Sequence, residues 1–337
     1  KEELRTFFKN KGDQAFRGNQ VYEWLWQKGV HSFEAMTSLP KATREMLEAE
    51  FVINHIKVDV MQRSDDGTIK NAVRLHDGLL VESVLIPTDT RTTACVSSQV
   101  GCSLNCSFCA TARLKRMRNL LADEIYDQVR VIDEQSRAFF GRPLTNIVFM
   151  GMGEPFDNIG EVLRAIDILT SDWGLALSPR RITVSTSGLI DGTRRFLDSS
   201  QCHLAISLHN PFHDERRKIM PVEDTNPIAD LVALLRRYDF AHQRRLSFEY
   251  ILFDGLNDTP RHAAGIVQLL RGLPCRVNLI RFHRVEGSDF ASPSEERIEE
   301  FTRYLSHRGI IATVRRSRGE DIAAACGQLK NSLRLNR

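Results

Sequence analysis

The sequence lacks any long hydrophobic run. No stretch approaches the roughly 18 consecutive apolar residues that a membrane-spanning helix requires, and residues 1–11 lack the apolar segment of a secretory signal. No internal repeat of short period and no low-complexity segment is present. These absences predict a cytoplasmic protein without membrane attachment. The chain opens with Lys1 rather than Met, so we expect further residues to precede it.

The chain also has little net charge and no obvious set of paired cysteines. The 46 Lys and Arg residues nearly balance the 43 Asp and Glu residues, and the net charge of +3 permits nucleic-acid binding without demanding it. The seven cysteines are an odd number, and three of them fall within eight positions. Without an export signal, this clustering favours metal or redox chemistry over structural disulfides. The 42% hydrophobic content is typical of a soluble protein with a sizeable core.

The N-terminal quarter of the chain shows two different hydrophobic patterns. Residues 1–54 carry apolar side chains near helical spacing, which predicts a helical accessory domain. Residues 55–87 read as short strands separated by turn signals at 65–67 and 77–78. Because the connecting loops are short, these strands predict a small antiparallel β extension.

From residue 88 onward, apolar strands alternate with helices. Strands are expected at residues 92–98, 146–150, 181–186, 203–208, 246–253, 275–282 and 310–315. Helices are expected at residues 123–135, 159–169, 191–197, 227–238, 260–270 and 293–307. This alternation predicts a parallel sheet in an α/β fold, either a closed barrel or a doubly wound sheet. In either form, chemistry belongs at the carboxyl ends of the strands.

Three cysteines, Cys102, Cys106 and Cys109, lie in one short segment after the first of these strands. Structural zinc sites and most iron–sulfur sites take four protein ligands. Three local thiols with no fourth nearby leave one coordination position open for a substrate or cofactor. On spacing alone, buried thiols or a zinc knuckle completed by a distant residue are equally acceptable interpretations.

Polar motifs follow several strands of the predicted sheet. Gly153 and Glu154 belong to a Gly-rich turn after the strand at 146–150, and Phe156 stands where a dinucleotide-binding fingerprint needs glycine. Ser185 and the segment 207–209 end the next two strands. Each hydroxyl alone is more typical of a strand-end cap, and their recurrence at successive strand ends predicts a binding site.

Lone cysteines are most often inert core residues. Cys202 and Cys275 fit that interpretation, whereas Cys326 fits a core role and a chemical role equally well. Glu82, on a predicted strand, reads by itself as an ordinary surface glutamate.

The Cys-x3-Cys-x2-Cys spacing, with Phe108 before the last cysteine, resembles the signature of the radical S-adenosylmethionine superfamily. More specifically, nearly the whole chain resembles the radical adenine-C2 methyltransferases of ribosomal and transfer RNA (RlmN type). The similarity lies in several motifs that occur in the family's order: Phe16-Arg-Gly-Asn-Gln-Val-Tyr-Glu-Trp-Leu, Ser97-Ser-Gln-Val-Gly-Cys102, Leu177-Ser-Pro-Arg-Arg181, Ser207-Leu-His209 and Ala325-Cys326-Gly-Gln-Leu329.

The resemblance implies a fold and two cofactors. It implies an N-terminal helical accessory domain at 1–54, a β extension at 55–87, and a core at 88–320 built as a partial (β/α)6 TIM-like barrel of the radical SAM type. A C-terminal segment at 321–337 would carry the methyl-accepting cysteine. Cys102, Cys106 and Cys109 would bind a [4Fe-4S] cluster. S-adenosyl-L-methionine would be bound by Gly153, Glu154, Ser185, Ser207, Leu208, His209 and His283.

The resemblance also implies a mechanism. Cys326 would first be methylated, and a radical formed on that methyl group would add to adenine C2. Cys95 would release the product by forming a disulfide with Cys326, and Glu82 would accept a proton. The target would be an adenine in the peptidyl transferase loop of 23S rRNA and an adenine next to the anticodon of tRNA. An electron donor such as flavodoxin would supply the electron to a monomeric enzyme.

The sequence departs from the commonest family pattern at two positions. Ala112 stands where glycine is usual, and His283 stands where an asparagine normally contacts the cofactor. A neutral imidazole still donates or accepts one hydrogen bond, so only that contact is in question.

Basic residues recur where we expect the rim of the barrel mouth, and together they would form a phosphate-binding surface. They are Arg113, Lys115, Arg116, Arg118, Arg180, Arg181, Arg216, Arg217, Lys218, Arg315, Arg316 and Arg318. Three other functions stay open: C8 methylation of the same rRNA adenine, another radical enzyme, and a zinc-containing RNA-binding module.

Overall fold

The structure is a computed structural model that describes residues 1–242 and 244–330. Residues 331–337 of the predicted C-terminal segment therefore lie outside the described residues. No helix in the described part is both long enough and apolar enough to cross a bilayer.

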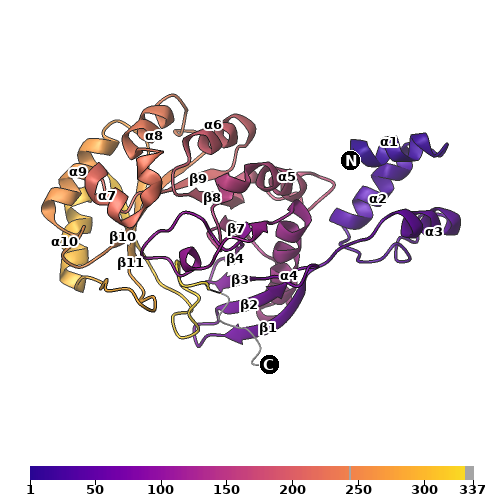
Figure 1. Cartoon of the computed structure of the whole chain (residues 1–337), viewed down its shortest axis with the longest axis horizontal. Helices are drawn as coiled ribbons and strands as arrows, with labels where there is room; N and C mark the ends of the chain where they lie inside the picture. Colours follow the sequence, from indigo (N-terminus) through magenta and orange to yellow (C-terminus); the bar gives the residue numbers. More distant parts are fainter. Residues whose placement is uncertain (243, 331–337) are drawn as a thin grey trace.

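Three helices form the predicted accessory domain, which stands to one side of the main body (Figure 1). They are α1 (Glu2–Asn10), α2 (Phe16–Trp26) and α3 (Lys41–Glu50). Their apolar faces enclose a separate small core that includes Phe8, Val21 and Leu47. The ring of Trp26 meets Tyr126 of the main body edge to face, with centroids 5.1 Å apart, and the Tyr126 hydroxyl donates to the Trp26 carbonyl. This contact ties the end of α2 to the barrel.

A single ten-stranded sheet dominates the rest of the chain, in the order β1-β2-β3-β4-β7-β8-β9-β10-β11-β12. Its strands are β1 (Lys57–Arg63), β2 (Ile69–Arg74), β3 (Leu80–Pro87), β4 (Thr92–Cys95), β7 (Asn146–Phe149), β8 (Ile182–Thr186), β9 (His203–Ser207), β10 (Leu246–Leu252), β11 (Arg276–Arg281) and β12 (Ile311–Arg315). Pairing is antiparallel from β1 to β4 and parallel from β4 to β12. The sheet is not closed, because β1 and β12 are edge strands.

The predicted β extension is thus part of the main sheet, because β3 pairs with β4 in the register Val84 to Cys95. The predicted α/β core, a partial barrel, is confirmed: seven parallel strands from β4 to β12 form an open sheet. The helices cover its outer face: α4 (Ala122–Phe140), α5 (Ile159–Thr170), α6 (Ile190–Ser199), α7 (His213–Ile219), α8 (Ile228–Leu235), α9 (Pro260–Leu270) and α10 (Glu295–Ser306).

Strand alternation sorts side chains between the two faces of the sheet. In β8, Ile182, Val184 and Thr186 are buried, whereas Thr183 and Ser185 are partly accessible on the other face. The apolar set packs under the helices in one large core, so the inner, concave face is left for polar side chains.

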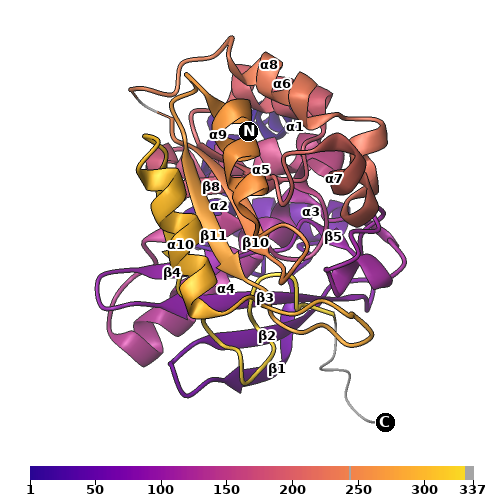
Figure 2. The same cartoon turned by 90° about the vertical axis from the view of Figure 1, so that its left-hand side faces the viewer.

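The C-terminal segment returns across the sheet beside β2 and β3 (Figure 2). Asp66 accepts a hydrogen bond from the Gly319 amide (3.0 Å), and Ser64 donates to Asp321 (2.6 Å). This segment, residues 319–330, brings the end of the chain back to the carboxyl ends of the strands.

Candidate active site

The cysteine loop, residues 101–117, is closed by a two-stranded ladder between β5 (Gln99–Val100) and β6 (Arg118–Asn119). Gly101 begins the loop with φ +79°, and a Cβ there would lie 2.4 Å from the Lys115 carbonyl oxygen, so only glycine fits. In the middle of the loop, the Ala110 amide donates to the Gly327 carbonyl (2.8 Å). The cysteine loop is therefore fixed against the C-terminal segment.

Cys102, Cys106 and Cys109 all line one cavity of about 130 Å³. Burial, with smaller contributions from the neighbouring thiols, raises the pKa of Cys102 to about 11 and raises that of Cys106 well above its usual range. Iron would have to displace the protons of these thiols, because only thiolates bind metal. Within the described residues, no three His, Cys, Asp or Glu side chains converge closely enough to hold a single metal ion. Three thiols on one loop fit the three protein ligands of a [4Fe-4S] cluster that leaves one iron open.

Glu154 enters the same cavity from the end of β7 and is buried. Its Oε1 accepts from the Phe156 amide (3.0 Å) and its Oε2 from the Ser187 amide (2.8 Å). Burial raises its pKa, and these hydrogen bonds partly oppose that change. Gly153 has φ +95°, and a Cβ would lie 2.4 Å from Gln99 Cβ. This packing fixes the carboxylate where an ammonium group in the cavity would meet it.

Ser185, Ser207 and His209 come from the ends of β8 and β9 and also line the cavity. Burial and then the charge of Arg216 lower the pKa of His209 to about 3, so its imidazole is neutral, and Nδ1 accepts from the Ile251 amide (3.0 Å). Leu208 stands between Ser207 and His209 in the sequence, and its side chain lies in the hydrophobic core. The predicted cofactor residues Gly153 to His209 thus converge, apart from the Leu208 side chain.

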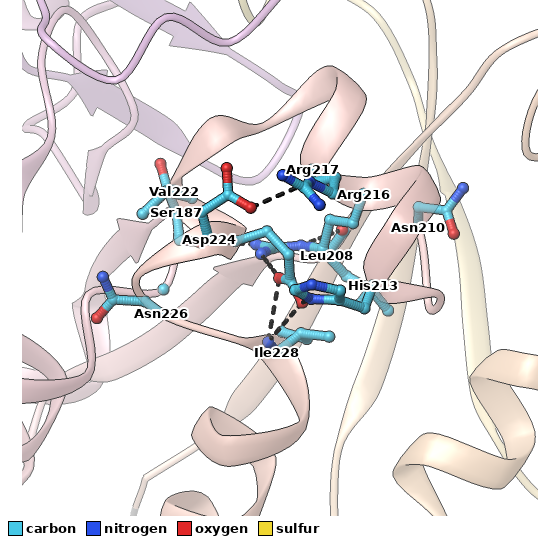
Figure 3. Close-up of polar contacts among 12 residues, drawn as sticks. Ser187, Leu208, Asn210, His213, Arg216, Arg217, Val222, Asp224, Asn226 and Ile228 are labelled. Carbon is cyan, nitrogen blue, oxygen red and sulfur yellow. Dashed lines mark hydrogen bonds and ion pairs between the residues drawn. The ribbon is translucent and has the colours of Figure 1, made fainter.

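The prediction that Arg216 belongs to a phosphate-binding surface is wrong. It is fully buried on α7 and paired with Glu223 (Figure 3). Its guanidinium donates to the carbonyls of Ser187 (2.7 Å), Ser207 (2.8 Å) and Leu208 (2.9 Å). Arg216 therefore holds the ends of β8 and β9 in place and is not available to RNA.

Arg180 and Arg181 precede β8, at the opposite end of the strands from the cysteines, so they do not rim the predicted mouth. Three other arginines of the predicted phosphate-binding surface already have partners within the protein. Arg113 donates to the backbone carbonyls of residues 286 and 287, Arg116 pairs with Asp157, and Arg118 pairs with Asp77 and Glu124. Fewer arginines are therefore available to bind phosphate at the mouth than the sequence predicted, because carboxylates and backbone carbonyls of the protein already contact these guanidinium groups.

Cys326 lines the cavity and is exposed within it. The loss of water around the thiol inside the cavity raises the pKa of Cys326, and the nearby positive charge of Arg315 opposes that change. Cys95 is buried on β4. Burial, with a smaller contribution from Cys326, raises the pKa of Cys95 to about 12. Neither cysteine forms a disulfide in the described part of the chain.

Two further residues line the cavity: Arg315, which the sequence placed in a phosphate-binding surface, and Glu249, for which it predicted no function. Arg315, expected at the rim, projects into the cavity from the end of β12. Glu249, in the middle of β10, is buried. Its Oε1 accepts from Asn278 (2.8 Å) and Ser247 (3.0 Å), whereas Oε2 has no hydrogen-bond partner in the described structure. Alternation along β10 was the available signal, because it places Glu249 on the concave face.

Glu82 is fully buried, so its interpretation as an ordinary surface glutamate is wrong. It lies 3.9 Å from the Lys70 ammonium, and its Oε2 accepts from the Lys330 amide (3.0 Å). It therefore contacts the C-terminal segment four residues beyond Cys326.

The two departures from the family pattern have different structural contexts. His283 does not line the cavity, and its ring contacts Ser317 (2.6 Å) and Glu320 (3.7 Å) instead. Ala112 lines the cavity within a short 3-10 helix, without a positive φ, so its backbone does not require glycine.

Comparisons with known proteins match the order of these features. Residues 1–53 match the family described as the ribosomal RNA large subunit methyltransferase N-terminal domain, and residues 96–264 match the radical SAM superfamily. The chain is 55% identical to a probable dual-specificity RNA methyltransferase RlmN of Flavobacterium johnsoniae, over 98% of this chain and 95% of that protein. The corresponding Flavobacterium psychrophilum protein is 56% identical, with 98% and 96% covered.

A crystal structure of a radical SAM methyltransferase from Sphaerobacter thermophilus superimposes with a TM-score of 0.90 at 44% identity, covering 97% of this chain and 96% of that one. Radical SAM enzymes use a [4Fe-4S] cluster and S-adenosylmethionine, and the cavity supplies three thiols and a carboxylate that suit these groups. Sequence, fold and cavity agree. The chain belongs to the RlmN family of dual-specificity RNA methyltransferases, within the radical SAM superfamily.

Proposed function

We propose that this enzyme methylates C2 of an adenine in the peptidyl transferase loop of 23S rRNA, and of an adenine next to the anticodon of tRNA, through a methylated Cys326. The observation that carries the proposal is the shared cavity: Cys326 lies in it with the three clustered thiols and Glu154. Adenine C2 is not nucleophilic, so polar methyl transfer to it faces a large barrier. A carbon radical does not need a nucleophilic partner.

The chain's own residues have distinct roles in this proposal. The cluster, when bound, supplies one electron that it receives from a donor such as flavodoxin. Cys102, Cys106 and Cys109 hold it, and Glu154 orients the ammonium group of S-adenosylmethionine by charge pairing. Ser185, Ser207, Leu208 and His209 bind the rest of that molecule through hydroxyl, backbone and imidazole groups.

Cys326 accepts a methyl group as a thiolate, which the nearby Arg315 guanidinium stabilises. A 5′-deoxyadenosyl radical derived from S-adenosylmethionine would take a hydrogen atom from that methyl group, and the methylene radical left on Cys326 would add to C2. Glu82 would accept the proton from C2, and the adduct would return one electron to the cluster. The Cys95 thiolate would then attack the sulfur of Cys326, so that the disulfide forms, the carbon–sulfur bond breaks and the released carbon takes up a proton to become the methyl group. Cys326 lies close enough to Cys95 to contribute to the raised pKa of the Cys95 thiol, and this proximity supports the pairing.

The test is anaerobic reconstitution with iron, sulfide, a reductant and S-adenosylmethionine, followed by mass spectrometry of nucleosides from treated rRNA and tRNA. We expect 2-methyladenosine. The Cys326→Ala variant should keep its iron and lose methylation by at least about 10³-fold, as expected for loss of a covalent catalyst. Cys275→Ala, which changes a cysteine outside the cavity, should retain both.

Three outcomes would contradict the proposal. Formation of 8-methyladenosine would assign the C8 reaction instead. Methylation by Cys326→Ala would exclude the covalent route. Active protein holding stoichiometric zinc in place of iron would exclude the radical chemistry altogether.

A further inference from the structure

A second cleft opens at the amino ends of the parallel strands, opposite the cysteine cavity. It encloses about 1240 Å³, against about 130 Å³ for the cysteine cavity. Residues just before or at the start of β7, β8, β9, β10, β11 and β12 line it. Seven-residue β10 rises about 3.3 Å per residue, so its wall separates the two openings by roughly 20 Å.

Five exposed arginines surround this cleft, which we call the arginine cleft: Arg91, Arg180, Arg181, Arg245 and Arg276. No carboxylate is among its lining residues. In the described part of the chain, none of the five forms an ion pair or donates a side-chain hydrogen bond. Many other arginines of the molecule do, including Arg113, Arg116, Arg118 and Arg216.

The charge gathered here exceeds that of the whole molecule. Five guanidinium groups stand at one cleft of a chain whose net charge is +3. The positive charge of the cleft affects the neighbouring His203. Burial is the largest cause of its lowered pKa, followed by the charges of Arg245, Arg180 and Arg244. Unpaired like charges repel one another and destabilise the folded state. Their arrangement is therefore explained by an anionic partner that neutralises them.

The neighbouring side chains indicate which kind of anion binds. Ser178, Asn146, Thr183 and Asn278 add neutral hydrogen-bonding groups to the arginines, a combination that suits phosphate oxygens. Phe240, the only aromatic ring apart from histidine in the described lining, is buried, so it is not a stacking platform for bases. An acidic electron-donor protein fits less well, because it must approach the cysteine cavity at the other end of the barrel.

We infer that the arginine cleft binds the sugar–phosphate backbone of the substrate RNA at a point remote from the adenine being methylated. This inference rests on the proposed function for the identity of the RNA. RNA that occupies both openings must extend past the barrel wall, so a full-length tRNA uses the cleft and an isolated stem-loop does not.

The test compares a cleft variant, Arg180→Gln/Arg245→Gln/Arg276→Gln, with a control variant, Arg137→Gln/Arg194→Gln/Arg303→Gln, that removes three exposed arginines elsewhere. Binding of a full-length tRNA transcript and of its anticodon stem-loop is measured over a range of salt concentrations. For the full-length tRNA we expect the cleft variant to lose about tenfold or more in affinity, with a salt slope smaller by about 2, because about three phosphate contacts disappear. Binding and methylation of the stem-loop should match the wild type.

A measurement without RNA separates charge relief from misfolding. The cleft variant should melt at or above the wild-type temperature, because it removes repulsion, whereas the control loses the pairs of Arg137 with Asp133 and of Arg194 with Asp191. Equal tRNA affinity of the two variants at every salt concentration would overturn the inference. Normal tRNA binding with slower flavodoxin-dependent cleavage of S-adenosylmethionine would assign the cleft to a protein donor instead. If wild-type protein methylates no adenine, the proposed function fails, while the binding comparison still decides the role of the cleft.

Discussion

Arg216 and Arg217 are adjacent in the sequence and have opposite surroundings. Arg216 is fully buried with Glu223, whereas Arg217 pairs with Asp224 at the surface (3.0 Å), where both side chains are about half exposed. Removing one member of a buried pair leaves an uncompensated charge, which costs about 3–5 kcal/mol. Removing a surface pair costs at most about 1 kcal/mol.

We therefore expect Arg216→Ala to lower the free energy of unfolding by about 3–5 kcal/mol, and Arg217→Ala to change it by at most about 1 kcal/mol, in urea titrations. Affinity for S-adenosylmethionine should fall only in Arg216→Ala, because the carbonyls of Ser187, Ser207 and Leu208 lose their donor. Equal stability of the two variants would show that the buried pair contributes nothing specific.

The same two arginines show what sequence could predict about single residues. The clustered cysteines, Glu154 and Cys326 were predicted from motifs with a distinctive order, and the structure places them in one cavity. The sequence predicted Arg216 as a phosphate contact, because a basic run on a short helix shows the same pattern whether one member is buried or all are exposed. The surface interpretation of Glu82 was wrong for a related reason, since one of its contacts is the Lys330 amide, about 250 residues away in the chain.

Helix α4 links the accessory domain to the barrel through a partly buried carboxylate. Asp127 accepts from the Ile56 amide (3.3 Å), at the point where the chain leaves the accessory domain. Burial, with a smaller contribution from Asp123, raises the pKa of Asp127 to about 7 from an ordinary value of 3.8. Between these values the folded state holds a proton that the unfolded state releases.

Stability conferred by this proton is therefore present at about pH 4 and is lost as the pH rises to about 7, by at most about 1.4 kcal/mol per pH unit. Asp127→Asn should remove that part of the dependence, so the difference in unfolding free energy between wild type and variant should widen in favour of the variant from pH 4 to pH 7. Urea denaturation at several pH values measures it. Parallel pH profiles would contradict the raised pKa.

Elements were predicted well where a long period was visible. The strands and helices of the barrel follow the apolar alternation closely, because each strand is buried under a helix. α7 was missed, since its seven residues are mostly charged. The β5–β6 ladder was missed because two residues per strand carry no period.

At the scale of the whole molecule, the β extension and the active site form one structure. β1 to β3 continue the barrel sheet, and their turn at residues 64–68 holds the C-terminal segment through Gly319 and Asp321. The sequence pattern predicted an antiparallel extension but not its role, because pairing between strands and a distant loop leaves no local signal. Its position suits a support for Cys326, which we propose as the methyl carrier.

Gly319 offers a direct test of this support. Its φ is +64°, and a Cβ there would lie 2.8 Å from Thr68 Cγ2 and from Ala324 Cβ. Gly141, at the end of α4, has the same φ of +64°, with nothing within 4 Å of such a Cβ. Alanine at either site costs about 1–2 kcal/mol of backbone strain, but only Gly319→Ala also pushes the C-terminal segment away from the β2 turn.

We expect Gly319→Ala to slow RNA methylation about 10- to 100-fold, the range expected when a reacting group moves by about 1 Å. Iron content and cleavage of S-adenosylmethionine in the absence of RNA should persist, because the cysteine loop has its own supports at β5 and β6. Gly141→Ala should lose similar stability and methylate normally, because Gly141 lines neither the cysteine cavity nor the arginine cleft. If both variants methylate at one rate, the β extension does not position Cys326, and the methyl carrier depends on the cysteine loop alone.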